Sequence, residues 1–211
     1  SPDLFHPNKI LYSVCASASL MNLFKKQRDS VGLSLFSDSL HFHSTNKGTN
    51  KHHMLLKSKM VEVLNNSNKF ISTSTVDSIH QIASRIQKRS LVLIFTDMLE
   101  GVEDLSEIFL AFQHLKFQKH ELVLFHLKDR KTEFNLEFPN TPHNFIDIET
   151  KEEVRLNPIE IRDTFMEQSN LFLKELKLRC LQHKIDLVEV DINKGIEQIL
   201  ISYLLKRQKM F

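Results

Sequence analysis

The spacing of the hydrophobic positions differs from one segment of the chain to the next. Some segments have the spacing of β-strands, and others have that of amphipathic helices. Residues 91–95 form an uninterrupted apolar run that stops at Thr96 and Asp97. A short run rich in β-branched and aromatic residues is typical of a strand buried on both faces of a parallel sheet. Ligands of such sheets bind at the carboxyl ends of the strands. Asp97 is therefore a candidate functional residue, and the alternative is that it begins a loop and helps to cap the next helix.

The remaining pattern predicts one α/β domain over residues 1–211. Further strands are expected at 31–36, 40–43, 121–127 and 185–190, and helices at 8–26, 52–64, 74–86, 104–115, 157–183 and 196–205. This order indicates a mostly parallel sheet with helices on both faces and one antiparallel edge strand at 40–43. Short alternating pieces at about 130–157 predict a small β excursion. Its aromatic segment, 134–145, is interpreted as a hairpin packed on the core, with a partner-docking surface as the alternative.

Composition and charge narrow the class of protein. The 28 basic and 26 acidic residues are interspersed and leave a net charge of +2, so binding of nucleic acid or of an anionic membrane is not implied. No apolar run has the length of a membrane span. Cys15 and Cys180 lie far apart in helix-like apolar patterns. We interpret them as reduced core thiols, which favours a cytoplasmic location.

Five segments carry a resemblance to a known family, and they follow one another along nearly the whole chain. They are residues 27–38, 89–97, 120–126, 145–150 and 203–207. Together they resemble bacterial von Willebrand factor A-like proteins that are encoded beside MoxR-type AAA ATPases, a family long catalogued as a domain of unknown function. The resemblance implies a von Willebrand A, Rossmann-like sheet with helices on both faces.

The resemblance also implies a metal-ion-dependent adhesion site at the carboxyl edge of the sheet. Such a site takes an Asp-x-Ser-x-Ser loop after the central first strand, a Thr from a second loop and an Asp from a third. These hard oxygen ligands suit Mg²⁺. Asp97 matches the third loop, and Thr49, within residues 47–50, is the candidate for the second. The first strand and its loop are expected upstream of Ser1, so this chain alone is not expected to bind Mg²⁺ well.

Two other groups of residues were weighed as sites. Four histidines are close in sequence and could include zinc ligands, but we interpret them as solvated edge-strand and helix-cap residues because no supporting ligand spacing accompanies them; they are His41, His43, His52 and His53. Ser37 and Asp38 resemble a nucleophile and its orienting acid. A hairpin turn explains both residues, and no histidine at a defined spacing completes a triad.

These observations predict a non-enzymatic protein-interaction module. Its partner-binding face would be the top of the sheet around Asp97 and residues 47–50, with Mg²⁺ assisting if the upstream loop is present. A MoxR-type AAA ATPase is the expected partner, in the assembly or maturation of other proteins. The alternatives are a metal-free scaffold with a degenerate adhesion site and, less favoured, a hydrolase on a Rossmann-like sheet.

Overall fold

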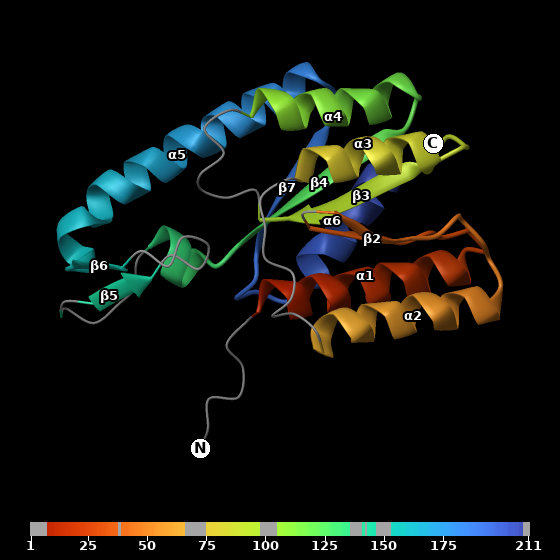
Figure 1. Cartoon of the computed structure of the whole chain (residues 1–211), viewed down its shortest axis with the longest axis horizontal. Helices are drawn as coiled ribbons and strands as arrows, with labels where there is room; N and C mark the ends of the chain where they lie inside the picture. The colour runs from red at the N-terminus through yellow and green to blue at the C-terminus, as the bar shows by residue number, and fades with distance from the viewer. Residues whose placement is uncertain are drawn as a thin grey trace.

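The chain forms a layered α/β structure in which helices cover both faces of a parallel sheet (Figure 1). The computed structural model describes residues 8–37, 39–65, 75–97, 105–135, 141, 143–146 and 153–208. The strands are β1 (Ser34–Phe36), β2 (Leu40–His43), β3 (Leu91–Thr96), β4 (Glu121–Lys128), β5 (His143–Ile146), β6 (Glu153–Leu156) and β7 (Asp186–Asp191). The helices are α1 (Lys9–Lys26), α2 (Asn50–Asn65), α3 (Thr75–Arg85), α4 (Ser106–Phe117), the π-helix η2 (Arg130–Phe134), α5 (Pro158–Gln182) and α6 (Glu197–Gln208).

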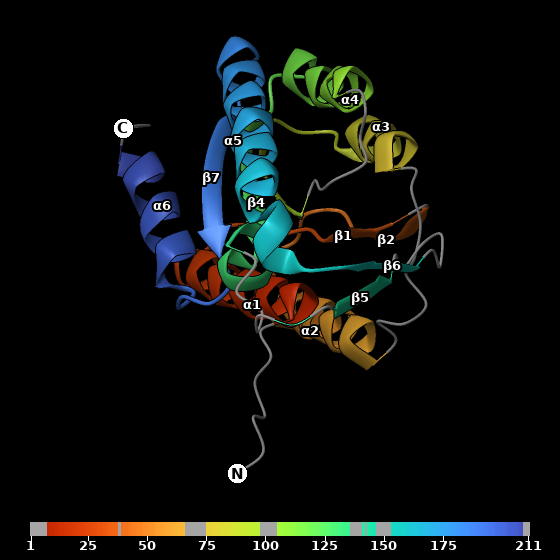
Figure 2. The ribbon, with the colours of Figure 1, turned by 90° about the vertical axis from the view of Figure 1, so that its left-hand side faces the viewer.

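The central sheet has the strand order β3-β4-β7, and both strand pairs are parallel. Alternate residues of β4 pack into two different hydrophobic cores, one on each face of the sheet. Leu122 and Leu124 pack with α3, α4 and α5, whereas Val123 and Phe125 pack with α1 and α6 on the opposite face (Figure 2). Because β4 is buried on both faces, its sequence is an almost continuous apolar run. The predicted parallel sheet with helices on both faces is confirmed.

The first two strands form a hairpin of their own. Residues 40–43 are antiparallel as predicted, but β2 pairs with β1 in a separate two-stranded sheet and not at the edge of the central one. The predicted strand at 31–36 begins only at Ser34. The Ser44 hydroxyl accepts the Leu33 N–H at 2.9 Å, and Val31 forms an isolated bridge with Lys47. A side chain thus replaces a backbone partner, and the regular ladder is interrupted before Ser34.

A groove of about 830 Å³ separates the hairpin from the central sheet. Strands β1 and β3 form its two sides, and residues of α1 and α3 line it as well, among them Ile10, Val14, Ile79 and Ile82. The further central strand that the resemblance implies stays a prediction.

The β excursion exists as a second hairpin, because β5 and β6 pair antiparallel as a two-stranded sheet. Figure 1 shows this pair beyond the end of α5, away from the central sheet. The interpretation of 134–145 as a hairpin packed on the core is therefore wrong for the described residues of β5. Part of the segment, at 136–140 and at 142, lies outside the described residues.

Local sequence signals set several helix ends. The Asn8 side chain accepts the N–H groups of Ile10 and Leu11, and the Asn157 side chain accepts that of Ile159. Both predicted caps are confirmed. Helix α4 instead follows Leu105, which makes no side-chain cap bond, and Asp104 of the predicted capping box lies outside the described residues.

The two cysteines have different surroundings. Cys180 is buried in α5, and burial raises the pKa of its thiol to about 12. Cys15 is exposed on α1, so its interpretation as a core thiol is wrong. The apolar stripe of α1 is broad, and its sequence alone did not show which side faces the core. Among the described residues, no helix combines the length and the hydropathy needed to cross a membrane.

Candidate functional site

Polar side chains occupy the carboxyl ends of the three central strands. Thr96 pairs in register with His126, and His126 pairs with Glu189. Register partners in a parallel sheet point to the same face, so these three side chains form a row across the sheet. The row lies under α5, where the rings of His126 and Phe172 are 6.3 Å apart. This is the edge at which open α/β sheets bind their ligands.

Asp97 follows directly after β3 at the same edge. Its side chain is 59% exposed, and its Oδ2 lies 3.6 Å from the Nζ of Lys9, which is only 18% exposed. Lys9 is the first residue of α1, so the ion pair joins the beginning of that helix to the end of β3. The alternative role for Asp97, capping the next helix, would involve residues 98–104, which lie outside the described part of the chain.

His126 is the most unusual residue of this edge. It is fully buried, and neither ring nitrogen makes a hydrogen bond of ordinary geometry among the described residues. Burial, with smaller contributions from Lys128 and Lys9, lowers the pKa of His126 to about 4, although the backbone of Asp97 and the carboxylate of Glu189 oppose this shift. The ring is therefore neutral at pH 7. Sequence analysis did not single out His126, although it interrupts the apolar run at 122–127.

A second buried histidine lies at the opposite end of β4. His120 Nδ1 accepts the Ser90 N–H at 3.2 Å, and its Nε2–H donates to Gln118 Oε1 at 3.2 Å. Gln118 in turn donates to His114 Nε2, whose Nδ1 lies 3.2 Å from Nδ1 of His80. Both nitrogens of His120 are thus used within a continuous polar network.

The structure does not bring Thr49 and Asp97 together. Thr49 lies at the beginning of α2, where its hydroxyl accepts the His52 N–H at 3.3 Å. The nearby Asn46 side chain donates to the hydroxyl of Ser90, which precedes β3. Thr49 is therefore near the amino end of β3, and the six residues of β3 span about 20 Å at roughly 3.3 Å per residue. The two residues cannot share one metal ion, which corrects the predicted pair.

Helix α3 begins at Thr75 on the same edge as Asp97. Figure 1 shows that α3 runs antiparallel to β3, so the start of this helix lies toward the carboxyl end of the strand. Thr49, which precedes α2, does not lie at this edge.

The described residues do not make a complete metal site. Among them, no group of three or more His, Cys, Asp or Glu side chains is arranged to hold a metal ion. Mg²⁺ needs several oxygen ligands at short distance. At the predicted position, Asp97 supplies one carboxylate, and the ammonium group of Lys9 already lies beside it. The residues present therefore do not fit a bound Mg²⁺ without further ligands.

The four histidines near the hairpin have separate roles. His52 Nε2 donates to the Val31 carbonyl at 2.9 Å, and His43 Nδ1 lies 3.0 Å from the Ser34 hydroxyl. His52 and His53 are buried on α2, so their interpretation as solvated residues is wrong. The ring of His52 faces the protein because it bonds to the carbonyl of Val31.

One contact was missed by sequence analysis. The hydroxyl of Ser37 lies 2.6 Å from Nε2 of His41, across the turn of the β1-β2 hairpin. The four-residue separation gave no signal by itself, because the register of the hairpin places these side chains together. Asp38 lies outside the described residues.

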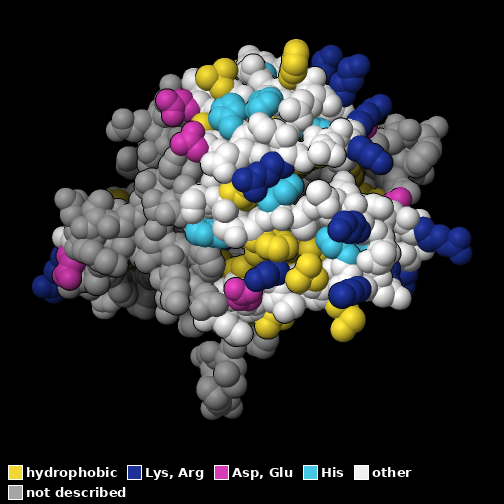
Figure 3. Space-filling model, turned by 45° about the vertical axis from the view of Figure 1, so that its right-hand side comes forward, with side chains coloured by type: hydrophobic (Ala, Val, Ile, Leu, Met, Phe, Trp, Pro, Cys, Tyr) yellow, Lys and Arg dark blue, Asp and Glu magenta, His cyan; other side chains and the backbone are white. Residues whose placement is uncertain are grey.

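Figure 3 shows one face of the molecule, on which Lys and Arg side chains are scattered among hydrophobic ones and histidines. This distribution agrees with the interspersed charges of the sequence. It does not indicate a continuous basic stripe on this face.

Comparison with known proteins assigns the family. The family model described as "Protein of unknown function DUF58" matches residues 6–171. The chain belongs to this family of proteins of unknown function. The matched residues include the β1-β2 hairpin and the strands β3 and β4. They also include helices α3 and α4, which precede and follow β3. No curated protein and no solved structure matches the chain.

Proposed function

We propose that this chain is a non-enzymatic protein-interaction module of the von Willebrand A type. Its partner would be a MoxR-type AAA ATPase, and its role would be in the assembly or maturation of other proteins. The parallel sheet with helices on both faces supports the fold type. The five matching segments of the sequence support the choice of partner. The membership in the DUF58 family is compatible with this role.

Asp97 is the observation that carries the proposal. Its exposed carboxylate projects from the end of a buried strand, and its partner Lys9 is held at the beginning of α1. Because the Asp97 carboxylate is exposed, its ion pair contributes about 0–1 kcal/mol, so a cationic group of a partner protein can replace Lys9 at little cost. A cationic group of the partner would bind Asp97, and an acidic group would bind Lys9. The carboxyl edge of the sheet is thus the proposed binding face.

The proposal does not depend on a metal ion. A metal-free scaffold is the second candidate, and the ion pair between Lys9 and Asp97 favours it because an ammonium group occupies the place beside the carboxylate. For this chain we expect no binding of Mg²⁺ or Mn²⁺ in isothermal titration. Binding that is present in the wild type and lost in Asp97→Ala would instead favour a metal-dependent adhesion site.

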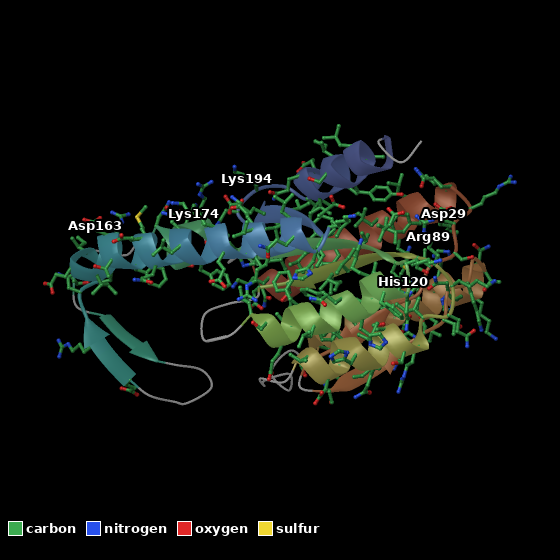
Figure 4. All side chains as sticks on the ribbon, turned by 90° about the horizontal axis from the view of Figure 1, so that it is seen from above. Asp29, Arg89, His120, Asp163, Lys174 and Lys194 are labelled. Carbon is green, nitrogen blue, oxygen red and sulfur yellow. The ribbon has the colours of Figure 1, made fainter. Side chains whose placement is uncertain are left out.

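The test of the proposal is capture of the purified MoxR-type ATPase on the immobilised chain. We expect Asp97→Ala to reduce the captured amount about tenfold, since a central charged contact is lost. Asp163→Ala is the matched control, because Asp163 is exposed near the beginning of α5, which Figure 4 shows at the outer end of that helix. Equal capture by all three proteins, or an equal loss in both variants, would contradict the proposed binding face.

A hydrolase is the less favoured alternative. The contact between Ser37 and His41 favours it, because a serine and a histidine within hydrogen-bond distance are two parts of a catalytic triad. The contact is exposed on a hairpin turn, where water competes with it. A hydrogen bond within a turn explains the pair without catalysis.

A further inference from the structure

A second cavity opens at the carboxyl edge of the sheet. It lies near the ends of β4 and β7, whereas Asp97 follows the end of β3. It has a volume of about 380 Å³ and lies between α5 and the loop that joins β7 to α6. Leu173 and Val190 are buried beneath it. Lys128 and Asp191, the last residues of β4 and β7, also line it. The cavity therefore lies at the strand ends where α/β sheets bind ligands.

Positive charge dominates this cavity, which we call the basic groove. Its five basic residues come from β4, η2, α5 and the loop before α6, and they are Lys128, Arg130, Lys174, Lys177 and Lys194. Two acidic residues also line the groove, so its net charge is +3. Figure 4 shows Lys174 on α5 and Lys194 beyond it in the same region of the surface. Charges of one sign in a concave site raise the local concentration of ligands of the opposite sign.

The acidic groups in and beside the groove are already bonded. Glu189 pairs with Lys177, with Oε1 and Nζ 2.5 Å apart. Asp191 Oδ1 accepts the backbone N–H and the side-chain amide of Asn193, at 3.0 and 3.2 Å. The same amide donates to Asp129 Oδ1 at 2.7 Å.

The hydrogen bonds of Asp129 also govern its ionisation. Burial raises the pKa of Asp129, but hydrogen bonds from Asn193, Thr132 and Lys131 outweigh this effect and lower the pKa below its usual value. Asp129 is therefore ionised at neutral pH. Its Oδ1, like that of Asp191, accepts the side-chain amide of Asn193, which joins the two aspartates and fixes the wall of the groove.

The arrangement of the basic residues indicates the kind of ligand. Lys174 and Lys194 are exposed, and their ammonium groups are point charges on flexible stems from α5 and from the loop before α6. Lys177, also exposed on α5, is already paired with Glu189. Such spaced charges suit several separate carboxylates. A compact phosphate is bound best by convergent backbone N–H groups or by forked arginine contacts. We propose that the basic groove binds an acidic, Asp- or Glu-rich segment of a partner protein.

This inference deepens the proposed function and rests on it, because it names the chemistry of the partner at the same edge of the sheet. The test uses a fluorescein-labelled oligoglutamate peptide, with binding followed by fluorescence anisotropy at fixed ionic strength. The groove variant is Lys174→Glu with Lys194→Glu. The control variant is Lys51→Glu with Lys57→Glu, which makes the same change in net charge at two exposed positions of α2.

We expect the groove variant to weaken peptide binding at least about tenfold, and the control variant to weaken it about twofold or less. Circular dichroism of both variants checks that they are folded. Equal losses in the two variants would mean that binding follows net charge alone and would overturn the inference. Displacement of the peptide by inorganic phosphate, but not by sodium chloride of equal ionic strength, would identify a phosphate site and also overturn it.

Capture of the ATPase separates this inference from the proposed function. If Asp97→Ala reduces capture while the groove variant binds the oligoglutamate peptide as well as the wild type does, the groove inference fails and the proposed function stands. If the groove variant alone loses the peptide but no protein captures the ATPase, the acidic-peptide groove stands and the choice of partner fails.

Discussion

One buried histidine lies at each end of β4, and the two histidines differ in the hydrogen bonds of their ring nitrogens. His120 at the amino end is 2% exposed and uses both ring nitrogens, toward Ser90 and Gln118. His126 at the carboxyl end is 0% exposed, and neither of its nitrogens makes a hydrogen bond of ordinary geometry among the described residues. A buried polar group without a partner costs about 1–3 kcal/mol. Within the described part of the chain, the ring of His120 thus has its hydrogen bonds satisfied and the ring of His126 does not.

The difference indicates which end is structural and which is functional. Satisfied polar networks stabilise a unique fold, whereas a native protein keeps an unsatisfied buried group where another requirement outweighs stability. His126 shares its edge with the exposed Asp97 and with the basic groove. The amino end has instead the network of His120 and the ion pair between Arg89 and Glu121. This contrast supports the proposed binding face at the carboxyl edge, and we expect the amino edge to contribute stability.

The largest expected effect is a pH dependence that comes from His126. Its pKa is about 4 in the folded protein and about 6.5 when unfolded, so folding favours the neutral ring. The stability that this gives is present above pH 6.5 and is lost as the pH falls toward 4. Between pH 7 and pH 5, we expect His126 to lower the free energy of unfolding by about 2 kcal/mol. Urea unfolding at the two pH values measures it.

The variant His126→Phe isolates the contribution of His126 to the pH dependence. Burial also lowers the pKa values of His43, His53 and His120, but these residues titrate in both the variant and the wild type. We expect the variant to lose about 2 kcal/mol less than the wild type over the same interval. An identical pH dependence in the two proteins would show that His126 is solvated or bonded, and the contrast between the two ends would be lost.

The next effect is a difference in stability at pH 7 between the variants His120→Phe and His126→Phe. His120→Phe removes an acceptor from the Ser90 N–H and a donor from Gln118, so we expect it to destabilise the protein by about 1–3 kcal/mol. His126→Phe breaks no such bond, and we expect a change of less than about 1 kcal/mol at this pH. Urea unfolding measures both variants. A larger loss in His126→Phe than in His120→Phe would reverse the assignment.

The smallest expected effect concerns the two surface ion pairs. Asp97→Asn at the carboxyl edge and Arg89→Gln at the amino edge should each change the free energy of unfolding by less than about 1 kcal/mol, because the replaced side chain of each pair is exposed. Thermal unfolding at low and high salt measures this. A marked destabilisation by Asp97→Asn would mean that the residue is structural, and the loss of ATPase capture in Asp97→Ala would need another explanation.

The sequence predicted helices and strands well where interactions between neighbouring residues determine them. The apolar runs at 91–95 and 121–127 predicted buried parallel strands, and Asn8 and Asn157 predicted helix starts. Each of these signals depends on neighbouring residues only. The position of Asp97 at the end of a strand follows from the same runs.

Predictions that depended on the direction of the chain or on neighbours in space were weaker. Thr49 was assigned to the edge of Asp97, but the antiparallel turn from β1 to β2 returns the chain to the amino edge before α2 begins. Cys15 lies on the exposed side of α1, and residues 31–33 leave the regular ladder because Ser44 bonds to Leu33.

By itself, the sequence determined where the strands and helices lie and which residue ends β3, because period and capping are local properties. Only the tertiary structure decided that His126 is buried with no hydrogen-bond partner for its ring among the described residues, that Lys9 lies beside Asp97, and that five basic residues from four segments line one groove. These features join residues far apart along the chain. They depend on the crossovers of the parallel sheet, which bring the ends of β3, β4 and β7 to one edge.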